Sequence, residues 1–440
     1  MNEAAVNLFH QSEAARKRGD KGVAKKLIQA ALAVDDTLPG AWYNLGSDLH
    51  NEGNRVAAIA ALRRCEELAG DEPYSLTNLG WNLQLEGRFA EALAVLDRAI
   101  ATGPSLPLGW SNRSLTHNSL HNAQQSIADA REAVRLAPDD AQHHMALAFA
   151  LMMDGQWAEG LKEYEWRFQY KMPEFLSYPM PRWNGEYVET LFVPAEQGLG
   201  DTLQFIRFVS WAAQSVGKLI LSVQEELFSL VESCGLFGDN VTVLQMPCAV
   251  PKADAFCPLM SLPVALKCED GRVPMQHPNW FSDAFGKRNN AKRDRKKIGI
   301  IWAGSAEQDN DHHRSATVED FLGLYEAKGV QLYSFQVGDR AKECRKYAPL
   351  VIDLSPRIRD FIDTAALMCD MDAIVSVCTS TAHLAGSLGL KTHIVLPRHG
   401  QHFVWGHSGS ETPWYPTARL HRQARIGDWA SVISSVAGEL

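Results

Sequence analysis

The sequence lacks the paired cysteines and long apolar runs that mark several protein classes. Its eight cysteines are scattered, without a CxxC pair, as is typical of reduced, mostly buried thiols, so we expect neither disulfides nor a structural zinc site. No apolar run reaches the roughly 18 residues needed to cross a bilayer. Residues 1–20 also lack the apolar core of a signal peptide. These absences predict a cytoplasmic chain without a membrane span.

A surplus of positive charge is also missing. The 440 residues carry a formal net charge of -9 at pH 7, whereas a nucleic-acid partner would demand a basic surface. The one basic run, residues 287–297, is short and is predicted to be a solvated linker. With 46% hydrophobic and 22% charged residues, the composition is that of a soluble globular protein with two or three domains.

The glycine turn of residues 195–205, AEQGLGDTLQF, lacks the third glycine of a dinucleotide fingerprint. After Gly198 and Gly200 that position holds Leu203, which argues against an NAD site. Asp201 stands where a helix is expected to begin. From this stretch alone, an N-cap role is favoured over chemistry, because Asp commonly accepts hydrogen bonds from the free N–H groups of a helix start.

A 34-residue period runs through the first 170 residues. Residues of one kind recur at this step, namely the large apolar Trp42, Leu76 and Trp110 and the small Gly46 and Gly80. This order of positions resembles the tetratricopeptide repeat, a helix pair that stacks into a superhelix. We therefore expect an α-solenoid of about five repeats over residues 1–171, with degenerate first and last units.

Three asparagines share one position of the repeat. Asn44, Asn78 and Asn112 fall in phase on the first helix of their units, on the side that resembles the concave face of such arrays. A ladder of carboxamides can donate to and accept from an extended peptide backbone. The alternative is that Asn is merely frequent at this position. We slightly favour a groove that binds a protein partner, because a solenoid of this length normally binds something.

Beyond the repeats, a proline-rich junction over residues 172–190 leads to two segments in which β-rich runs alternate with helical stretches. These segments are residues 191–290 and 291–440. The alternation predicts parallel sheets of the α/β class. If the two halves meet across a cleft, their strand ends face each other, and that is where ligands bind in open α/β sheets.

Five strings occur in a fixed order after the repeats: WNG, AEQGLGDTLQFIRF, IGIIWAGS, DFIDTAALMCDMDAIVSVCTSTAHLAGSLG and TPWYPTARLHRQ. Together they resemble bacterial repeat-fused glycosyltransferases whose catalytic part is similar to the heptosyltransferases of lipopolysaccharide synthesis. The layout also resembles that of the O-linked N-acetylglucosamine transferases. The resemblance covers essentially the whole chain. It implies a GT-B fold of two Rossmann-like halves, with the acceptor side on the first and the nucleotide-sugar donor side on the second.

On the acceptor side, the resemblance implies that Asp201 is the catalytic base. In the heptosyltransferase-like family a Gly-Asp pair begins the first helix of the fold, and Gly200-Asp201 matches it. A carboxylate near a helix start stays ionised and ready to accept a proton. With this resemblance, chemistry is favoured over capping for Asp201. Gln197 and Arg207 are weaker candidates for binding the acceptor.

On the donor side, the family segment Asp-Thr-Gly followed by His contacts the phosphates of the donor. Thr379 and His383 match that segment, whereas Cys378 replaces the Asp and Ser380 the Gly. The start of a helix with hydroxyls suits a phosphate, although His383 could instead be a core histidine. Further donor-side positions implied by the resemblance are Arg314, which would reach the leaving phosphate, and Gln336, Asp363 and Thr364 near the nucleotide.

The stretch Asp309-Asn310-Asp311 spells a DxD, the metal motif of another transferase class. The GT-B resemblance implies no such role, so we expect no metal ion and no cofactor beyond the nucleotide sugar. The sequence thus predicts a metal-independent glycosyltransferase that transfers a sugar to Ser or Thr of a protein, for which flagellin is the acceptor that the resemblance suggests. A saccharide acceptor and a non-catalytic repeat scaffold remain the alternatives.

Overall fold

The computed structural model describes residues 2–172, 174–175, 178–268, 294–304 and 311–440. The chain divides into two compact units, Met1–Ala150 and Leu151–Leu440. Their boundary lies inside α9, ahead of residue 171, where the sequence predicted the first domain to end. Each unit is described below by itself.

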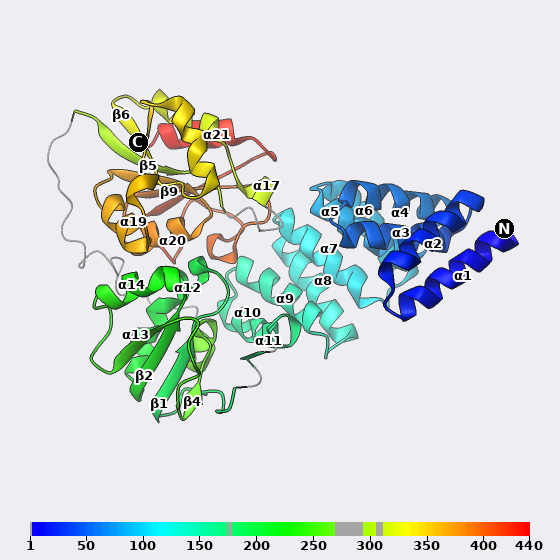
Figure 1. Cartoon of the computed structure of the whole chain (residues 1–440), viewed down its shortest axis with the longest axis horizontal. Helices are drawn as coiled ribbons and strands as arrows, with labels where there is room; N and C mark the ends of the chain where they lie inside the picture. The colour runs from blue at the N-terminus through cyan, green and yellow to red at the C-terminus, as the bar shows by residue number, and fades with distance from the viewer. Residues whose placement is uncertain (1, 173, 176–177, 269–293, 305–310) are drawn as a thin grey trace. The chain divides into compact units, whose positions relative to one another are not determined.

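The first unit is a row of antiparallel helix pairs, coloured blue to cyan in Figure 1. Pro39, Pro73 and Pro107 occupy first helical positions, where a missing N–H costs nothing because that group has no partner inside the helix. The helices are α1 (Glu3–Lys17), α2 (Lys21–Val34), α3 (Pro39–Asn51), α4 (Arg55–Ala69), α5 (Pro73–Leu85), α6 (Phe89–Thr102), α7 (Pro107–Ser119), α8 (Ala123–Leu136) and α9 (Ala141–Met153).

The in-phase glycines let the two helices of a pair approach closely. A side chain on Gly46 would meet Cγ of Leu62 at 2.7 Å, and one on Gly80 would meet Cγ of Leu96 at 2.5 Å. Both leucines are fully buried. The small residues that recur at these two positions of the repeat therefore lie where the paired helices approach closely.

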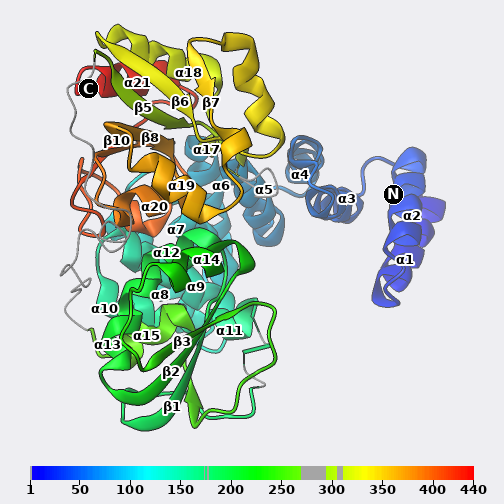
Figure 2. The same cartoon turned by 60° about the vertical axis from the view of Figure 1, so that its left-hand side comes forward.

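The second unit holds two parallel sheets, and every strand pair in them is parallel. The strand order is β3-β2-β1-β4 in one sheet and β10-β9-β8-β5-β6-β7 in the other. Figure 2 shows the green strands of the first sheet apart from the yellow and orange strands of the second. The βα alternation read from the sequence thus predicted α/β sheets correctly, and β10 adds a strand that was not predicted.

The elements of the second unit before residue 269 are α10 (Trp157–Tyr164), α11 (Arg167–Tyr170), β1 (Val188–Pro194), α12 (Leu199–Phe205), α13 (Val209–Ala213), β2 (Val216–Val223), α14 (Glu225–Ser233), β3 (Val241–Gln245), β4 (Ala255–Phe256) and α15 (Leu262–Ala265). Those after residue 293 are β5 (Lys296–Ile301), α17 (Asp311–Arg314), α18 (Val318–Leu322), β6 (Val330–Ser334), β7 (Val351–Asp353), α19 (Phe361–Met368), β8 (Ala373–Val377), α20 (Ser380–Ser387), β9 (Thr392–Leu396), β10 (Ala418–Arg422) and α21 (Trp429–Ala437).

A buried ion pair joins α11 to the first sheet. The guanidinium of Arg167 donates to both carboxylate oxygens of Glu196, at 2.8 and 2.7 Å, and to Oγ of Ser261 at 2.8 Å. The Glu196 carboxylate also accepts from the backbone N–H of Met260 at 3.1 Å. Because a buried charge needs such partners, this network fastens α11 to the four-stranded sheet within the second unit.

Removing one charge of this pair is expected to destabilise the second unit. In Glu196→Gln the buried Arg167 guanidinium keeps Glu165 as an ion-pair partner but loses the charged group that accepts two of its hydrogen bonds, so the free energy of unfolding falls by about 2 kcal/mol. Urea unfolding followed by tryptophan fluorescence measures the loss. The matched control is Glu411→Gln, which breaks the exposed Arg419–Glu411 pair and should change the free energy by less than about 0.5 kcal/mol. Equal effects of the two substitutions would contradict the anchoring role.

Candidate functional site

Two helix starts meet in the second unit. The helix α12 follows β1 and α20 follows β8, so both begin at the carboxyl end of a parallel strand. They touch at Gly200, where a side chain would lie 3.0 Å from Cδ2 of His383 and 3.7 Å from Cα of Ser380. The glycine turn and the predicted phosphate segment are therefore neighbours in space, at the place where α/β sheets bind ligands.

Both carboxylate oxygens of Asp201 are held by hydrogen-bond donors. The backbone N–H of Gly198 donates to Oδ2 at 3.1 Å, and Nε2 of His402 lies 3.2 Å from Oδ1. Gly198 is the N-cap, so Asp201 is the third helical residue and reaches back to the cap. The N-cap alternative was therefore wrong in position, although Asp201 does satisfy one free N–H of the helix start.

Asp201 remains ionised in this setting. Burial acts to raise the pKa of its carboxyl, but the hydrogen bonds from His402 and from the Gly198 N–H together lower it below the usual value. The carboxylate is thus an anion within a largely enclosed cluster. Such a group can accept a proton from a neutral hydroxyl or stabilise a positive charge.

His402 is a site residue that the sequence reasoning missed. It lies in the segment after β9 and caps the short 3-10 turn Phe403–Trp405, whose Val404 N–H donates to Nδ1 at 3.4 Å. This contact leaves Nε2 to carry the hydrogen that is donated to Asp201. The sequence did contain an indication of a site here. Residues 399–407 are rich in histidine and follow the carboxyl end of β9, where ligand-binding loops gather.

His383, on α20, lies next to the start of α12, which carries Asp201. Its Nδ1 lies 2.8 Å from the hydroxyl of Tyr415, and burial lowers the pKa of its imidazole to about 3, so the ring is neutral. Tyr415 packs against Gly386, where a side chain would lie 2.5 Å from the ring. The phosphate segment therefore holds a neutral histidine whose orientation Tyr415 fixes.

Arg207 packs against Tyr415 and is buried, so it does not face an open acceptor site. Only 5% of it is exposed, and its guanidinium donates to the carbonyls of Gln204 and Trp414 at 2.8 and 2.9 Å. It also lies 5.1 Å from the centre of the Tyr415 ring. Burial lowers the pKa of this guanidinium, which is nevertheless charged at neutral pH.

Cys378, at the position of the family's Asp, is a neutral thiol. The indole Nε1 of Trp405 donates to its Sγ at 3.0 Å, and burial raises the pKa of the thiol. The substitution therefore removes a possible negative charge next to the helix start of α20. Trp405 in turn stacks on His383, with 5.3 Å between the ring centres.

Arg314 and Gln336 are linked through the segment after β5. The carboxamide of Gln336 accepts from the N–H of Ala303 and donates to its carbonyl, both at 3.1 Å. The guanidinium of Arg314 packs against Gly304, with 2.2 Å to the place of a side chain. Its Nε lies 3.6 Å from Oδ1 of Asp311 and has no hydrogen-bond partner among the described residues. Arg314 therefore has a donor that the described residues do not use, whereas the oxygen and the nitrogen of the Gln336 carboxamide each make a hydrogen bond.

The remaining predicted donor residues lie at the starts of two helices. Thr379 is the N-cap of α20 and accepts from the N–H of Ala382, and Ser380 begins that helix. At α19, Thr364 donates to the carbonyl of Asp360 at 2.9 Å. Asp363 accepts from Arg359. These contacts serve α19 itself, and the place of both residues near a nucleotide stays a prediction.

Gln197 occupies a strained backbone conformation at the glycine turn. Its φ is 59°, in the left-handed region that non-glycine residues rarely adopt, and such strain gathers at functional sites. Its carboxamide forms a hydrogen bond with the Tyr164 hydroxyl.

Of the DxD motif of residues 309–311, Asp309 and Asn310 lie outside the described residues. The Asp311 carboxylate accepts from Arg340 and Ser315 at 2.8 and 2.7 Å.

In the first unit, the three in-phase asparagines bond to neighbouring helices. Nδ2 of Asn44 donates to Glu13 at 2.5 Å, that of Asn78 to Ser47 at 3.4 Å, and that of Asn112 to the Thr77 carbonyl at 3.4 Å. Only 4% of Asn112 is exposed, whereas the other two are half-buried. A peptide-binding role stays a prediction, and Asn44 and Asn78 are its better candidates.

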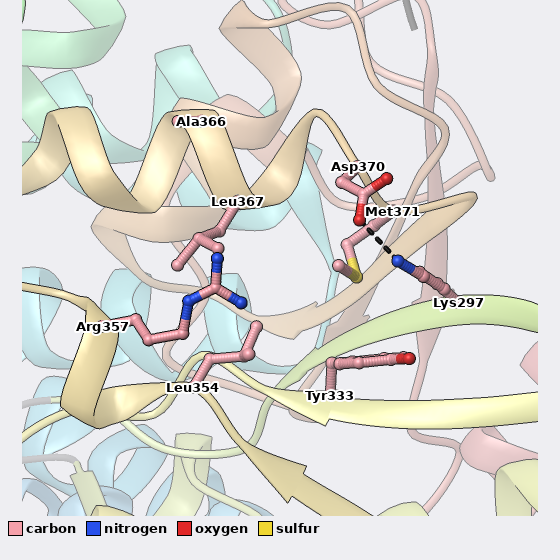
Figure 3. Close-up of a pocket in the computed structure, with 8 residues that line it drawn as sticks. All are labelled: Lys297, Tyr333, Leu354, Arg357, Ala366, Leu367, Asp370 and Met371. Carbon is pink, nitrogen blue, oxygen red and sulfur yellow. Dashed lines mark hydrogen bonds and ion pairs between the residues drawn. The ribbon is translucent and has the colours of Figure 1, made fainter. Parts of the chain in front are cut away.

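A separate cavity of about 230 Å³ lies beside α19. Figure 3 shows Arg357 reaching between Leu354 and Leu367, while Lys297 pairs with Asp370 at 2.5 Å. None of its lining residues belongs to the predicted donor or acceptor sites.

Across the part of the chain that the structure describes, no helix is both long and apolar enough to span a membrane.

Comparisons with known proteins support the repeat assignment. A family model of the tetratricopeptide repeat matches residues 39–72. The chain is 23% identical to the protein FlbA of Caulobacter vibrioides, over 95% of this chain and 75% of that protein. It is also 37% identical to the Hsp70-Hsp90 organizing protein of Triticum aestivum, over 18% of this chain and 14% of that protein.

Among solved structures, MamA of Desulfovibrio magneticus matches 40% of this chain and 99% of its own, with 18% identity and a TM-score of 0.34. The matched family model covers one full 34-residue period of the sequence repeat, from α3 to the end of α4. The first unit is therefore a solenoid of tetratricopeptide repeats, as the period predicted.

The buried histidines of the second unit predict an acid-sensitive fold. Burial lowers the pKa of His383 and His393 to about 3, so below pH about 6.5 the unfolded chain binds protons that the folded one does not. The free energy of unfolding should fall by about 1.4 kcal/mol per pH unit for each histidine between pH about 6 and 4.5. Asp201, with its lowered pKa, contributes only below that window.

The measurement is urea unfolding at several pH values in this window, on the wild-type chain and on His383→Gln. Removing one titrating imidazole should reduce the slope of the free energy of unfolding against pH by the contribution of that one histidine. An identical slope in the variant would show that His383 is not the neutral, buried group described above.

Proposed function

We propose that the chain is a glycosyltransferase that moves a sugar from a nucleotide donor to a hydroxyl group. The observation that carries this proposal is the ionised Asp201 at the contact of two helix starts, each following a strand of a different parallel sheet. That arrangement offers a proton acceptor next to free N–H groups that suit a phosphate. The five ordered strings, which resemble the GT-B enzymes, support the same reaction class.

The proposal includes a GT-B arrangement, in which each sheet belongs to one Rossmann-like half. The four-stranded sheet with α12 would form the acceptor half, and the six-stranded sheet with α20 the donor half. All strand pairing in both sheets is parallel, which is consistent with this arrangement. No metal ion and no cofactor is assigned a role in the transfer.

In the proposed reaction, the acceptor oxygen attacks the anomeric carbon of the sugar. The bond from that carbon to the phosphate oxygen of the nucleotide breaks, and Asp201 takes the hydroxyl proton. His402 positions the carboxylate through its hydrogen bond to Oδ1. Because both oxygens of Asp201 already accept one hydrogen bond each, the carboxylate is fixed in place and loses no freedom when the acceptor arrives.

The leaving phosphate would be stabilised by Arg314 and by the start of α20. Arg314 has an unpartnered Nε among the described residues, and Thr379 and Ser380 supply hydroxyls there. In the proposed tautomer, the Tyr415 hydroxyl donates to Nδ1 of His383 across their 2.8 Å contact, and the neutral imidazole carries its hydrogen on Nε2. That Nε2–H can bond an anionic oxygen without a change of charge.

We propose a protein as the acceptor, docked by the repeats, and the sequence resemblance makes flagellin the first protein to test. Repeats of this kind bind protein partners, and the half-buried Asn44 and Asn78 are the proposed contacts. A saccharide acceptor is the second candidate. It is favoured by the burial of Asn112 and by the hydrogen bonds of all three carboxamides inside the solenoid, which reduce what the groove offers to a peptide.

The first test replaces the proposed base. Asp201→Asn keeps an oxygen at the glycine turn but cannot take a proton, so turnover should fall about 100-fold or more while the melting temperature stays close to that of the wild type. The donor is first identified from a panel of CMP-, UDP-, GDP- and ADP-sugars by the rise in melting temperature on binding. Glu411→Gln, an exposed carboxylate, is the control. Full activity in Asp201→Asn would exclude the carboxylate as base.

The second test concerns the acceptor. The double substitution Asn44→Ala and Asn78→Ala removes two half-buried carboxamides and leaves the buried Asn112 in place. At low acceptor concentration, transfer to a protein should fall about ten-fold, since each lost hydrogen bond contributes about 0.5–1.5 kcal/mol. Asn51→Ala, on an exposed site at the end of α3, is the matched control. Undiminished protein transfer would favour the saccharide acceptor.

The two tests also address a non-catalytic scaffold. A chain that binds none of the nucleotide sugars and transfers none of them would be such a scaffold, with Cys378 as the departure from the family pattern. Loss of donor binding in Arg314→Ala, measured by calorimetry, would instead support a working donor site.

A further inference from the structure

Three side chains that can bind metal ions converge at the edge of the six-stranded sheet. His393 lies on β9, His421 on β10, and Glu439 follows α21. The parallel register pairs His393 with Arg419 and Val395 with His421, so the two imidazoles lie on the same face of the sheet. The segment α21, which contacts both strands, brings the carboxylate of Glu439 to that face.

The spacing of the ligand atoms suits one small cation. Nδ1 of His393 lies 3.0 Å from Nε2 of His421 and 3.9 Å from Oε2 of Glu439, and all three atoms fall within 4.8 Å of one another. Zn²⁺ holds such ligands at about 2.0–2.2 Å, which places neighbouring ligand atoms roughly 3–3.6 Å apart. The two nitrogens already have this spacing. The Glu439 side chain is 48% exposed and is free to approach.

Both imidazoles are prepared to ligate. Burial lowers the pKa of each ring, so both are neutral at physiological pH, as a metal ligand must be. The other ring nitrogen of His421 contacts Oγ of Ser435 at 3.2 Å, which orients the ring as outer partners of metal ligands do. Nε2 of His393, on the far side of the ring from His421 and Glu439, is buried without such an outer partner among the described residues.

The charges around the cluster allow a cation. Lys391 donates its ammonium to the backbone carbonyl of Glu439, and Arg419 is paired with Glu411. The Glu439 carboxylate is the one anionic ligand. Beside the cluster is a cavity of about 250 Å³ lined in part by His421, Ser435 and Glu439. It provides a path for entry and space for a water molecule at a fourth position.

We propose that His393, His421 and Glu439 form a binding site for a divalent transition-metal ion, with Zn²⁺ as the first ion to test. None of these three residues has a role in the proposed glycosyl transfer, and the metal site does not depend on that function. The two-histidine, one-carboxylate set leaves a position open, so a bound ion would keep a water molecule or an external ligand. The competing explanation is a hydrogen-bonded histidine pair that binds no metal.

The test uses the full chain, freed of metal by a chelator and titrated with Zn²⁺ in a calorimeter. The chain should bind a Zn²⁺ equivalent that is lost or weakened at least ten-fold in Glu439→Gln and in His421→Ala. Glu439→Gln alters an exposed group and is expected to fold normally, which keeps the test informative if His421→Ala does not fold. The matched controls are Glu226→Gln, an exposed carboxylate on α14 of the same unit, and His10→Ala, an exposed histidine of the first unit.

A second measurement is the rise in melting temperature on adding Zn²⁺, because an ion that binds only the folded chain stabilises it. The rise should persist in both controls and disappear in Glu439→Gln. Zn²⁺ binding that is the same in wild type, Glu439→Gln and His421→Ala would place the ion elsewhere and overturn the proposal. The absence of any Zn²⁺ binding to the wild-type chain would leave the two histidines as a hydrogen-bonded pair.

Discussion

The close approach of α12 and α20 is the constraint on which the chemistry of the second unit depends. The two helices touch where Gly200 meets His383, and any side chain at position 200 would press on that ring. Because each helix follows a strand of a different sheet, this one contact brings together the carboxyl ends of two sheets. The proposed base, Asp201, sits directly after the glycine, so its place relative to the phosphate segment is fixed by the same contact.

Around that contact, burial and hydrogen bonding decide the charge of each group. Donors on both oxygens keep Asp201 ionised despite its burial, whereas burial keeps the His383 imidazole neutral although Asp201 is nearby. Arg207 keeps its charge through two backbone carbonyls and the face of Tyr415. The cluster thus contains a fixed anion and a buried cation separated by neutral rings, an arrangement in which little must reorganise when a charged donor enters.

In the first unit the polar residues of the repeats mainly connect neighbouring helices. Arg16 pairs with both oxygens of Asp48 in the next repeat, and His50 bonds Asn82 one repeat further along. These contacts recur at nearly the same spacing as the sequence period. Each one stabilises the interface between two adjacent repeats, so the stability of the solenoid is spread along its length. A partner that binds the groove must therefore use side chains that these contacts leave accessible.

The sequence by itself determined the repeats, the parallel α/β sheets and the glycine turn before Asp201, because each depends on local periodicity or on neighbours along the chain. Only the tertiary structure decided that His402 bonds Asp201, from which it is separated by 201 positions, or that His393, His421 and Glu439 converge. It also decided that Asn112 is buried while Asn44 is not, although both occupy the same repeat position. Such contacts join side chains from distant elements. Their distances are set by strand register and helix packing, which cannot be read from a local sequence pattern.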